Sequence, residues 1–417
     1  MNILILNLHS ALNLGDDAIM SETLRGVREL YPKATITAAA NDPASWQKYD
    51  KINVVGSLAT WVVERKEEEW RWRKVLFVLY AGLLAMAAVV YRISRVRIRF
   101  GNRQQRALLN AYYDADLVLS CGGGNFYAHG SLSIALFCSL LTLAFAKALG
   151  KKLIMLPQSI GPISGHLQQV IAKMVFNRVD RILVREHKSV DFLRNIGVRQ
   201  PVHLLPDLAF GFPSQDDQDD RTSLGIEASD TLRIGVTVMD RGAQEKQFGG
   251  QQGYERALES VLLRLNQERQ AHIYLFVQCY GPTPDQDDRL CTRRLYERLK
   301  QQVSTLTLLD SFSSASELKR AYKQMDCIIG TRMHTGIFAL TKCVPVVLIA
   351  YQPKAFGVMK SFGLERFCSS IEEVRESELY DQLQEVLNHR SQLQKYISQR
   401  YADQGARLQG WARHLQD

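Results

Sequence analysis

The sequence predicts an α/β protein with two doubly wound, Rossmann-like domains, and three observations support this fold class. Segments typical of strands and helices alternate along the chain. A polar, acidic stretch at residues 213–231 interrupts the alternation and is typical of a linker. The 417 residues suffice for two domains with separate cores. Alternation of this kind gives parallel sheets with helices on both faces.

The first predicted domain covers residues 1–212, and short apolar runs within it indicate strands. These runs lie at residues 3–6, 34–38, 117–119, 153–156, 182–184 and 202–205. Longer segments with helical spacing of apolar residues lie at residues 17–30, 132–149, 167–176 and 189–196. A basic and apolar insert at about residues 62–106 separates the second strand from the third.

The second predicted domain, residues 232–417, resumes the alternation. Strands are expected near residues 234–238, 273–277, 328–329 and 346–349, with helices between them. Ligands of doubly wound domains bind at the carboxyl ends of the strands, so we expect an interdomain cleft there. The sequence leaves open whether the C-terminal helices, residues 376–416, cross back to the first domain.

Composition and charge narrow the function classes. With 46% hydrophobic and 23% charged residues, the chain is typical of a folded protein. Residues 64–106 hold eleven Lys or Arg and four Glu, a net +7 of the total +9, so the remainder is close to neutral. This distribution argues against nucleic-acid binding and for one local basic patch. Seven scattered cysteines without a CxxC pair, and no signal peptide, favour the cytoplasm.

The segment Gly-Thr-Arg-Met-His-Thr-Gly at residues 330–336 is the most informative part of the chain. It follows an apolar run that is typical of a buried strand and precedes an apolar helix. Free N–H groups and the helix dipole favour an anion at such a junction. Arg332 and His334 lie in it, and Lys354 follows the next strand. We therefore expect these three residues to come from adjacent loops and to bind an anion.

Other strand ends carry further candidates. Gly122, Gly123 and Gly124 follow a strand and allow close backbone approach to a ligand, although they form neither a GxGxxG motif nor a P-loop. Arg185, at another strand end, has two open roles. It either pairs with Asp207 or Glu186, or contacts a ligand. No His, Cys or Asp cluster has metal-ligand spacing, so no metal site is expected.

The remaining candidates are neutral or acidic. Asn13 is a ligand candidate, whereas Asp16 either caps the following helix or binds a ligand, and Gly15 allows a tight turn. A further group offers donors and acceptors suited to sugar hydroxyls. It comprises Asn125, Gln158 and Ser159, the last two in a turn defined by Pro157, Gly161 and Pro162.

In this order, the motifs resemble those of the polysaccharide pyruvyl transferase family. Each motif is weak alone, but seven in the right order over roughly residues 1–364 are strong. They are Asn13-Leu14-Gly15-Asp16, Gly122-Gly123-Gly124, Pro157-Gln158-Ser159-Ile160-Gly161-Pro162, Arg185-Glu186-His187-Lys188-Ser189, Pro206-Asp207-Leu208-Ala209, Arg332-Met333-His334 and Tyr351-Gln352-Pro353-Lys354. The apolar insert after Trp61 departs from the family pattern.

The resemblance implies a GT-B-like fold and an enzyme of exopolysaccharide or cell-surface polysaccharide biosynthesis. It implies transfer of the carboxyvinyl unit of phosphoenolpyruvate, as co-substrate and without a cofactor, to a saccharide acceptor as a ketal. The implied roles place His334 and Arg332 in catalysis and Asn13, Asp16, Asn125, Gln158 and Ser159 at the acceptor. The donor would be bound by Arg332, Lys354, Arg185, Gly122, Gly123 and Gly124.

Several alternatives stay open at this stage. A helix N-terminus favours neutral imidazole, whereas a bound trianion favours imidazolium, so His334 starts as either acid or base. A GT-B glycosyltransferase with a nucleotide-sugar donor would share the fold. No Glu after Tyr351 matches the ribose-binding residue of many such enzymes. A non-catalytic saccharide-binding relative is disfavoured because Arg332 and His334 are both present.

The insert suggests contact with a membrane. Residues 75–91 carry no charge, while basic residues flank them on both sides. As a helix they would reach about 25 Å, short of the roughly 30 Å hydrocarbon core. A crossing would also separate the first strand from the strand at residue 117. We therefore expect residues 70–99 to lie on an anionic, cytoplasmic membrane face, which suits a lipid-linked acceptor, with a buried or oligomer-forming helix as the alternative.

Overall fold

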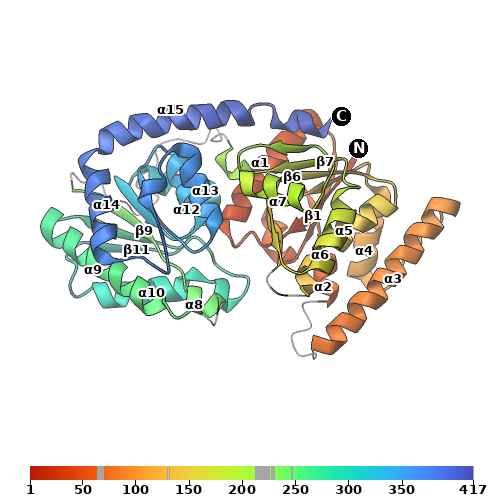
Figure 1. The fold of residues 1–417 in the computed structure, drawn as a ribbon, viewed down its shortest axis with the longest axis horizontal. Coiled ribbons are helices and arrows are strands. Elements are labelled where there is room, and N and C mark those ends of the chain that lie inside the picture. Colours follow the sequence, from red (N-terminus) through yellow and green to blue (C-terminus); the bar gives the residue numbers. More distant parts are fainter. Residues whose placement is uncertain are drawn as a thin grey trace. The chain divides into compact units, whose positions relative to one another are not determined.

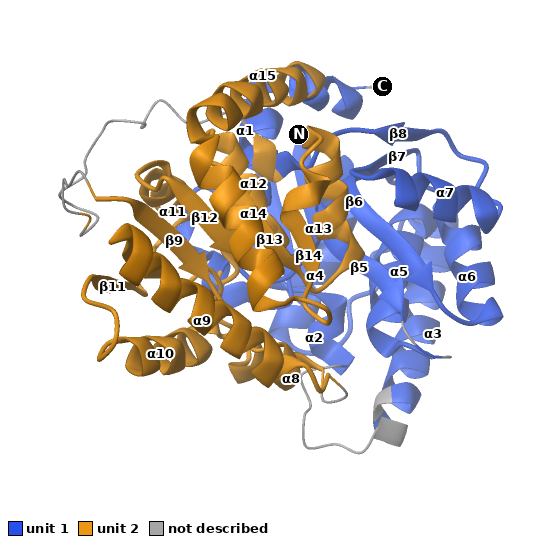
Figure 2. Cartoon of the chain, turned by 60° about the vertical axis from the view of Figure 1, so that its left-hand side comes forward, with its two compact units in different colours: residues 1–11, 19–208, 408–417 blue, residues 12–18, 209–407 orange. Residues whose placement is uncertain are grey.

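The computed structural model describes residues 1–62, 70–128, 130, 132–211, 226, 231–245 and 248–416 (Figure 1). The chain forms two compact units (Figure 2). Unit 1 contains Met1–Ala11, Ile19–Leu208 and Leu408–Asp417, and unit 2 contains Leu12–Ala18 and Ala209–Arg407. Leu12–Ala18 thus departs from the predicted boundaries, whereas the membership of Leu408–Asp417 in unit 1 is the alternative that the sequence left open. The predicted linker lies outside the described residues except for Ile226 and Thr231.

Unit 1 is built on an eight-stranded parallel sheet with the order β3-β2-β1-β4-β6-β7-β8, and β5 pairs with β6. The strands are β1 (Asn2–Leu8), β2 (Thr35–Ala40), β3 (Asn53–Gly56), β4 (Leu117–Ser120), β5 (Gly123–Ala128), β6 (Lys152–Ile163), β7 (Arg181–Val184) and β8 (Val202–Leu204). β4 is buried throughout, as expected for a parallel strand covered on both faces. The six predicted strands are confirmed, and β3 and β5 are additional.

The helices of unit 1 lie between these strands along the chain. The first of them begins in unit 2 and continues in unit 1. They are α1 (Leu14–Leu30), α2 (Leu58–Val62), α3 (Trp70–Ser94), α4 (Arg103–Asp114), α5 (Ile134–Ala148), α6 (His166–Phe176) and α7 (His187–Asn195). The short helix η6 (Trp411–Leu415) also belongs to unit 1, where Trp411 Nε1 donates to Glu22 at 2.8 Å. A Cβ at Gly26 would lie 2.3 Å from the Trp411 ring, so this glycine admits the C-terminal segment.

The Pro-Gln-Ser motif corrects one prediction. It lies inside the 12-residue strand β6 rather than in a turn after it. Gln158 pairs with Gly123 of β5 and with Val184 of β7, and the register shifts beside Pro157. Proline has no N–H to donate, so a bulge is where a sheet tolerates it. The sequence prediction therefore mistook a bulged strand for a turn.

Unit 2 is built on a six-stranded parallel sheet with the order β11-β10-β9-β12-β13-β14. The strands are β9 (Arg233–Thr237), β10 (His272–Phe276), β11 (Leu306–Leu309), β12 (Cys327–Gly330), β13 (Val346–Ala350) and β14 (Cys368–Ser370). The helices are α8 (Arg241–Gln244), α9 (Gln251–Arg269), α10 (Asp288–Leu299), α11 (Ala315–Lys323), α12 (Met333–Thr341), α13 (Pro353–Phe362), α14 (Glu376–Asn388) and α15 (Arg390–Leu408). The four predicted strands are confirmed.

Both sheets follow one topological rule. Each starts near its centre, winds outward to one edge and then reverses, which is the doubly wound order. The reversal lies between β1 and β4 in unit 1 and between β9 and β12 in unit 2. Ligands of such sheets bind outside the carboxyl ends of the strands at this reversal. The loops after these four strands are therefore where candidate site residues should be sought.

Helix α3 is longer than the sequence suggested. It has 25 residues, and Lys74–Ser94 is long and apolar enough to cross a bilayer by length and composition. The expectation that the segment is too short to span is therefore wrong.

Candidate functional site

In unit 2, residues 330–336 form the predicted junction between a strand and a helix. Strand β12 ends at Gly330, Arg332 is the N-cap of α12, and His334 lies in its first turn. The helix begins earlier than the apolar run suggested, which brings both side chains to its N-terminus. No acidic residue lies in that first turn. The unpaired N–H groups and the dipole of α12 therefore favour an anion there.

Arg332 is held by a buried carboxylate that the sequence did not reveal. Its Nε and Nη2 donate to the two Asp288 oxygens at 2.6 and 2.7 Å, and Nη2 also lies 3.4 Å from the Gln286 carbonyl. Burial alone would lower the pKa of Arg332, but Asp288 more than offsets this and keeps the pKa above its usual value. Burial raises the pKa of Asp288, and Arg332 opposes the rise. Within the described part of the chain, Nη1 of Arg332 makes no hydrogen bond, which leaves one direction for a ligand.

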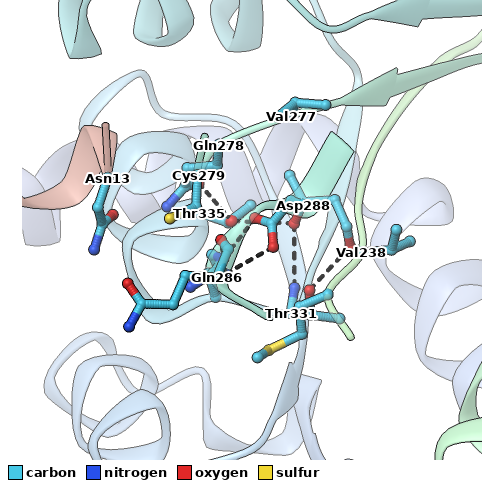
Figure 3. A network of polar contacts seen from close by, with 12 residues as sticks. Asn13, Val238, Val277, Gln278, Cys279, Gln286, Asp288, Thr331 and Thr335 are labelled. Carbon is cyan, nitrogen blue, oxygen red and sulfur yellow. Dashed lines mark hydrogen bonds and ion pairs between the residues drawn. The ribbon is translucent and has the colours of Figure 1, made fainter. Parts of the chain in front are cut away.

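Hydroxyl groups fix the start of α12 against the neighbouring strands (Figure 3). The Thr331 N–H donates to Thr237 Oγ1, and the Thr331 hydroxyl donates to the Thr237 carbonyl, both at 3.2 Å. The Thr335 hydroxyl donates to Gln278 Oε1 at 2.7 Å, and Tyr322 contacts the same oxygen at 3.4 Å. This network joins the ends of β9, β10 and β12. It makes the junction rigid, as a preorganised site requires.

The Asn-Leu-Gly-Asp segment at residues 13–16 belongs to unit 2, and its Gly15 contacts the His334 ring. A Cβ at Gly15 would lie 2.1 Å from His334 Nδ1, so only glycine leaves room for the imidazole. Gly15 lies in the first turn of α1, so the predicted tight turn is wrong. Position 15 requires glycine because the His334 ring packs directly on the backbone of α1 there.

The polar residues of the same segment have structural roles. Asn13 accepts from the Gly15 N–H at 3.1 Å and donates to Asp16 at 3.2 Å. Asn13 rather than Asp16 therefore makes the cap at the start of α1. Asp17 accepts from the Ala315 N–H at 2.9 Å, at the beginning of α11. The assignment of Asn13 and Asp16 to an acceptor stays a prediction.

Two further cations lie on loops at the same edge of the sheet. Lys354 is in the first turn of α13, which follows β13, the neighbour of β12. Arg241, which the sequence analysis missed, begins α8 after β9, and its guanidinium lies 5.3 Å from the centre of the Tyr351 ring. Burial raises the pKa of Tyr351, and nearby Arg332 opposes this. Burial likewise raises the pKa of the Cys279 thiol to about 11, so this cysteine is no thiolate nucleophile at neutral pH.

In unit 1 the glycine segment has a packing explanation. A Cβ at Gly122 would lie 2.7 Å from the Pro157 carbonyl, so β5 and β6 need a glycine there. Gly123 has a φ of 137°, which glycine adopts readily. Gly124 lies in β5. Asn125 Nδ2 donates to the Asn7 carbonyl at 2.7 Å. This contact joins the segment to the end of β1.

Gln158 of unit 1 is fully buried, and neither atom of its amide makes a hydrogen bond with a described residue. Leaving a buried amide unpaired costs about 1–3 kcal/mol, which favours a further polar partner in that place. The prediction that Gln158 lies in a turn is wrong, because β6 continues through it between β5 and β7.

Arg185 forms the ion pair with Asp207 that the sequence analysis considered, and its assignment to a ligand stays a prediction. Its Nη1 donates to Asp207 at 2.5 Å, and its Nε donates to Ser159 at 2.9 Å. The Arg185 and Asp207 side chains are 4% and 3% exposed. Ser189 donates to Glu186 at 3.2 Å and accepts from the Ile160 N–H at 2.8 Å, which accounts for the serine of that motif.

The candidates thus form two sets, one on each unit. Unit 1 holds Gly122, Gly123, Gly124, Asn125, Gln158, Ser159 and Arg185, and unit 2 holds Asn13, Asp16, Arg332, His334 and Lys354. Sequence reasoning missed Asp288, Gln278 and Arg241, which lie outside the motifs. No group of three His, Cys, Asp or Glu side chains in the described ranges could hold a metal ion.

The fold is similar to several solved structures at 10–13% identity, which shows the fold alone. UDP-GlcNAc 2-epimerase from Neisseria meningitidis bound to UDP-GlcNAc aligns with a TM-score of 0.59 and 10% identity, over 100% of this chain and 99% of that one. The Methanocaldococcus jannaschii epimerase gives 0.55 and 10%, over 93% of each chain. MurG from Acinetobacter baumannii gives 0.52 and 13%, over 100% and 99%. The chain thus has a GT-B-like fold.

Sequence comparison is more specific. The amylovoran biosynthesis protein AmsJ of Erwinia amylovora is 28% identical over 293 residues, or 68% of each chain. Residues 13–353 match the family described as "Polysaccharide pyruvyl transferase". This match includes nearly every residue on which the resemblance rests. The chain belongs to the polysaccharide pyruvyl transferase family.

Proposed function

We propose that this protein transfers the carboxyvinyl unit of phosphoenolpyruvate to two hydroxyls of a saccharide and forms a pyruvate ketal. The observation that carries the proposal is the junction of β12 and α12, where a buried Arg332 and His334 share a helix N-terminus. Family membership supports polysaccharide pyruvylation in general. The identity of the donor rests on the chemistry of this junction.

The donor carries a carboxylate and a phosphate, so its site needs cations at fixed positions. Arg332 supplies a charged guanidinium whose orientation Asp288 fixes through two hydrogen bonds. Because the Arg332–Asp288 pair is already neutral, another cation must balance the donor. Lys354, in the first turn of α13, is suited to this role, whereas Arg241 already forms an ion pair with Glu245. The family-based assignment of Arg185 and Gly122, Gly123 and Gly124 to the donor stays a prediction.

The reaction balances with one acid/base residue and no redox partner. A sugar hydroxyl attacks C2 of the enol while C3 gains a proton, and the second hydroxyl then displaces phosphate from C2. Two hydroxyl protons are lost, one proton goes to C3 and one to the leaving phosphate. His334 is our proposed proton carrier, since its ring lies at the two helix starts that contain Gly15 and Arg332.

We assign the saccharide acceptor to the polar residues of unit 1. Asn125 is half-buried beside Gly123, where the nearest atom to an added Cβ is Asn125 Nδ2 at 3.9 Å. The unpaired Gln158 amide next to it provides both a donor and an acceptor. Neutral groups of this kind suit hydroxyls better than they suit an anion.

A thermal-shift panel tests the donor. Phosphoenolpyruvate should stabilise the full chain, and UDP should not, because stabilisation follows affinity for the folded state and reaches about 2.7 kcal/mol at 100 times Kd. Lys354→Gln should reduce the shift. Lys360→Gln, an exposed change at the other end of α13, should leave it intact. Stabilisation by UDP alone would replace this proposal with a nucleotide-sugar transferase.

A further inference from the structure

Helix α3 has two apolar faces, and one of them is packed against unit 1. Leu84, Ala87 and Ala88 on this face are buried, and α3 lies against α5. Ring contacts extend the packing, with Tyr80 at 5.2 Å from Trp61. The helix is therefore fixed to unit 1 along its length.

The opposite face of α3 is apolar and exposed. Its exposed apolar residues recur every three or four positions, which places them on one stripe. They are Trp72, Val75, Val78, Leu79, Met86, Val89 and Ile93. Val78 is 69% exposed and Ile93 81% exposed. At 1.5 Å per residue the stripe is about 30 Å long. An exposed apolar area of this extent marks an interaction surface.

The charge within and after this stripe has a single sign, whereas four Glu precede it in the sequence at residues 64–69. Residues 70–106 contain nine Lys or Arg and no Asp or Glu. Arg92 and Arg95 are exposed at the C-terminal end of the stripe, and neither forms an ion pair with a described residue. Arg97, by contrast, pairs with Asp114 at 2.5 Å. The surface therefore presents an apolar stripe next to uncompensated positive charge.

Charge argues against a parallel pair of α3 helices as the occupant. Such a pair would bring Arg92 and Arg95 of one copy near their own equivalents, and no carboxylate within residues 70–106 relieves that repulsion. An anionic partner complements the same charges.

The packing of α3 also excludes a membrane crossing. The strands on both sides of the insert, β2 and β4, each pair with β1 in one sheet. A helix that crossed the bilayer would separate them, and the buried Leu84 face would lose its contacts. A helix lying in the plane of the interface keeps both.

We propose that the exposed face of α3 docks in the plane of an anionic lipid surface. The apolar stripe enters the boundary between headgroups and acyl chains, and the basic residues contact the headgroups. Trp72 at the start of the stripe suits the interface, where amphipathic rings are enriched. This surface is independent of the donor site on unit 2.

Sedimentation of the full chain with vesicles tests this proposal. Vesicles of phosphatidylglycerol and phosphatidylcholine should bind the protein, and pure phosphatidylcholine should bind it far less. Val78→Glu with Val89→Glu should weaken binding by roughly tenfold or more, since each removes buried apolar groups and adds repulsion. Leu167→Glu with Met174→Glu, at exposed apolar positions of α6, is the matched control and should bind normally.

Three results would overturn the proposal. They are absence of binding to anionic vesicles, equal binding by the α3 variant and the wild type, and a lipid-free dimer that the α3 substitutions dissociate. Circular dichroism of both variants shows whether each is folded. Weaker binding at high salt is also expected, because headgroup attraction is screened.

Discussion

Two strand-to-helix junctions, one in each unit, share the same spacing of Arg and His. Arg185 and His187 follow β7 in unit 1, and Arg332 and His334 follow β12 in unit 2. Each arginine is buried and bound to an aspartate. The local pattern is therefore the same twice, yet only one junction has the features of an anion site.

The difference lies in the residue at the helix start and in the histidine. In unit 1 the N-cap is Glu186, whose charge already complements the dipole of α7. In unit 2 the N-cap is Arg332, and the first turn of α12 holds no acid. His187 is exposed, whereas the His334 ring packs on Gly15. The N-terminus of a helix is therefore a candidate anion site only where no charged residue of the protein already balances the positive end of the helix dipole.

The largest expected effect is a difference in kcat between variants of the two histidines, His334 and His187. His334→Ala should lower kcat by about 100- to 10,000-fold, the usual contribution of a positioned acid/base. Stabilisation by phosphoenolpyruvate should persist, because Arg332 and Lys354 remain. His187→Ala, which changes the histidine two residues after the arginine of the other junction, should leave kcat unchanged. Release of phosphate from phosphoenolpyruvate with a saccharide acceptor measures both variants.

Normal turnover by His334→Ala would remove this residue from the mechanism. Equal losses in both variants would mean that the comparison between the junctions is wrong. Loss of the thermal shift in His334→Ala, with kcat reduced, would instead assign the histidine to donor binding.

Local patterns predicted most of the fold. Apolar runs bounded by polar residues identified the central strands of both sheets, including β12, because buried parallel strands are continuously apolar. β5 was missed since Gly-Gly-Asn at its start is typical of a loop. The extension of β6 through Pro157 was missed because proline and glycine usually end strands. Pairing with β5 and β7 decided both cases.

The site was predictable where its residues are adjacent in sequence. Arg332 and His334 stand out because they share one junction. Asp288 is 44 residues away at the start of α10, and nothing local shows that it binds Arg332. Gly15 and His334 are much farther apart in the sequence, and only the fold explains why position 15 must be glycine. Contacts between residues far apart in the sequence determine which candidate side chains can bind a ligand and which hold other side chains in place.

The second effect concerns two glycines, one in each unit, that each accommodate an aromatic ring. A Cβ at Gly15 would meet the His334 ring at 2.1 Å, and one at Gly161 would meet the Phe192 ring at 2.5 Å. Gly15→Ala should lower kcat roughly 100-fold, as a displacement of about 1 Å can. Its unfolding midpoint in urea should fall less than that of Gly161→Ala, because the clash is the only cost and the α1 backbone tolerates alanine.

Gly161→Ala should show the opposite pattern. Gly161 has a φ of 83°, so alanine adds about 1–2 kcal/mol of backbone strain to the clash. Its stability should fall, while kcat of the folded fraction stays close to normal. If kcat and stability changed in the same proportion in Gly15→Ala and Gly161→Ala, the distinction between a catalytic junction in unit 2 and a structural junction in unit 1 would be wrong.

The smallest effect tests the residue that distinguishes the junctions. Glu186→Gln removes the charge at the start of α7 but keeps an oxygen that accepts from Ser189. The free energy of unfolding should fall by about 0.3–1 kcal/mol, and the loss should shrink in high salt. Asp191→Asn, within the same helix, should have less effect, because the dipole acts mainly at the first turn. Urea titration of the full chain measures both. A gain in stability in the Glu186→Gln variant would mean that Glu186 does not compensate the dipole, and the contrast with Arg332 would then lose its electrostatic basis.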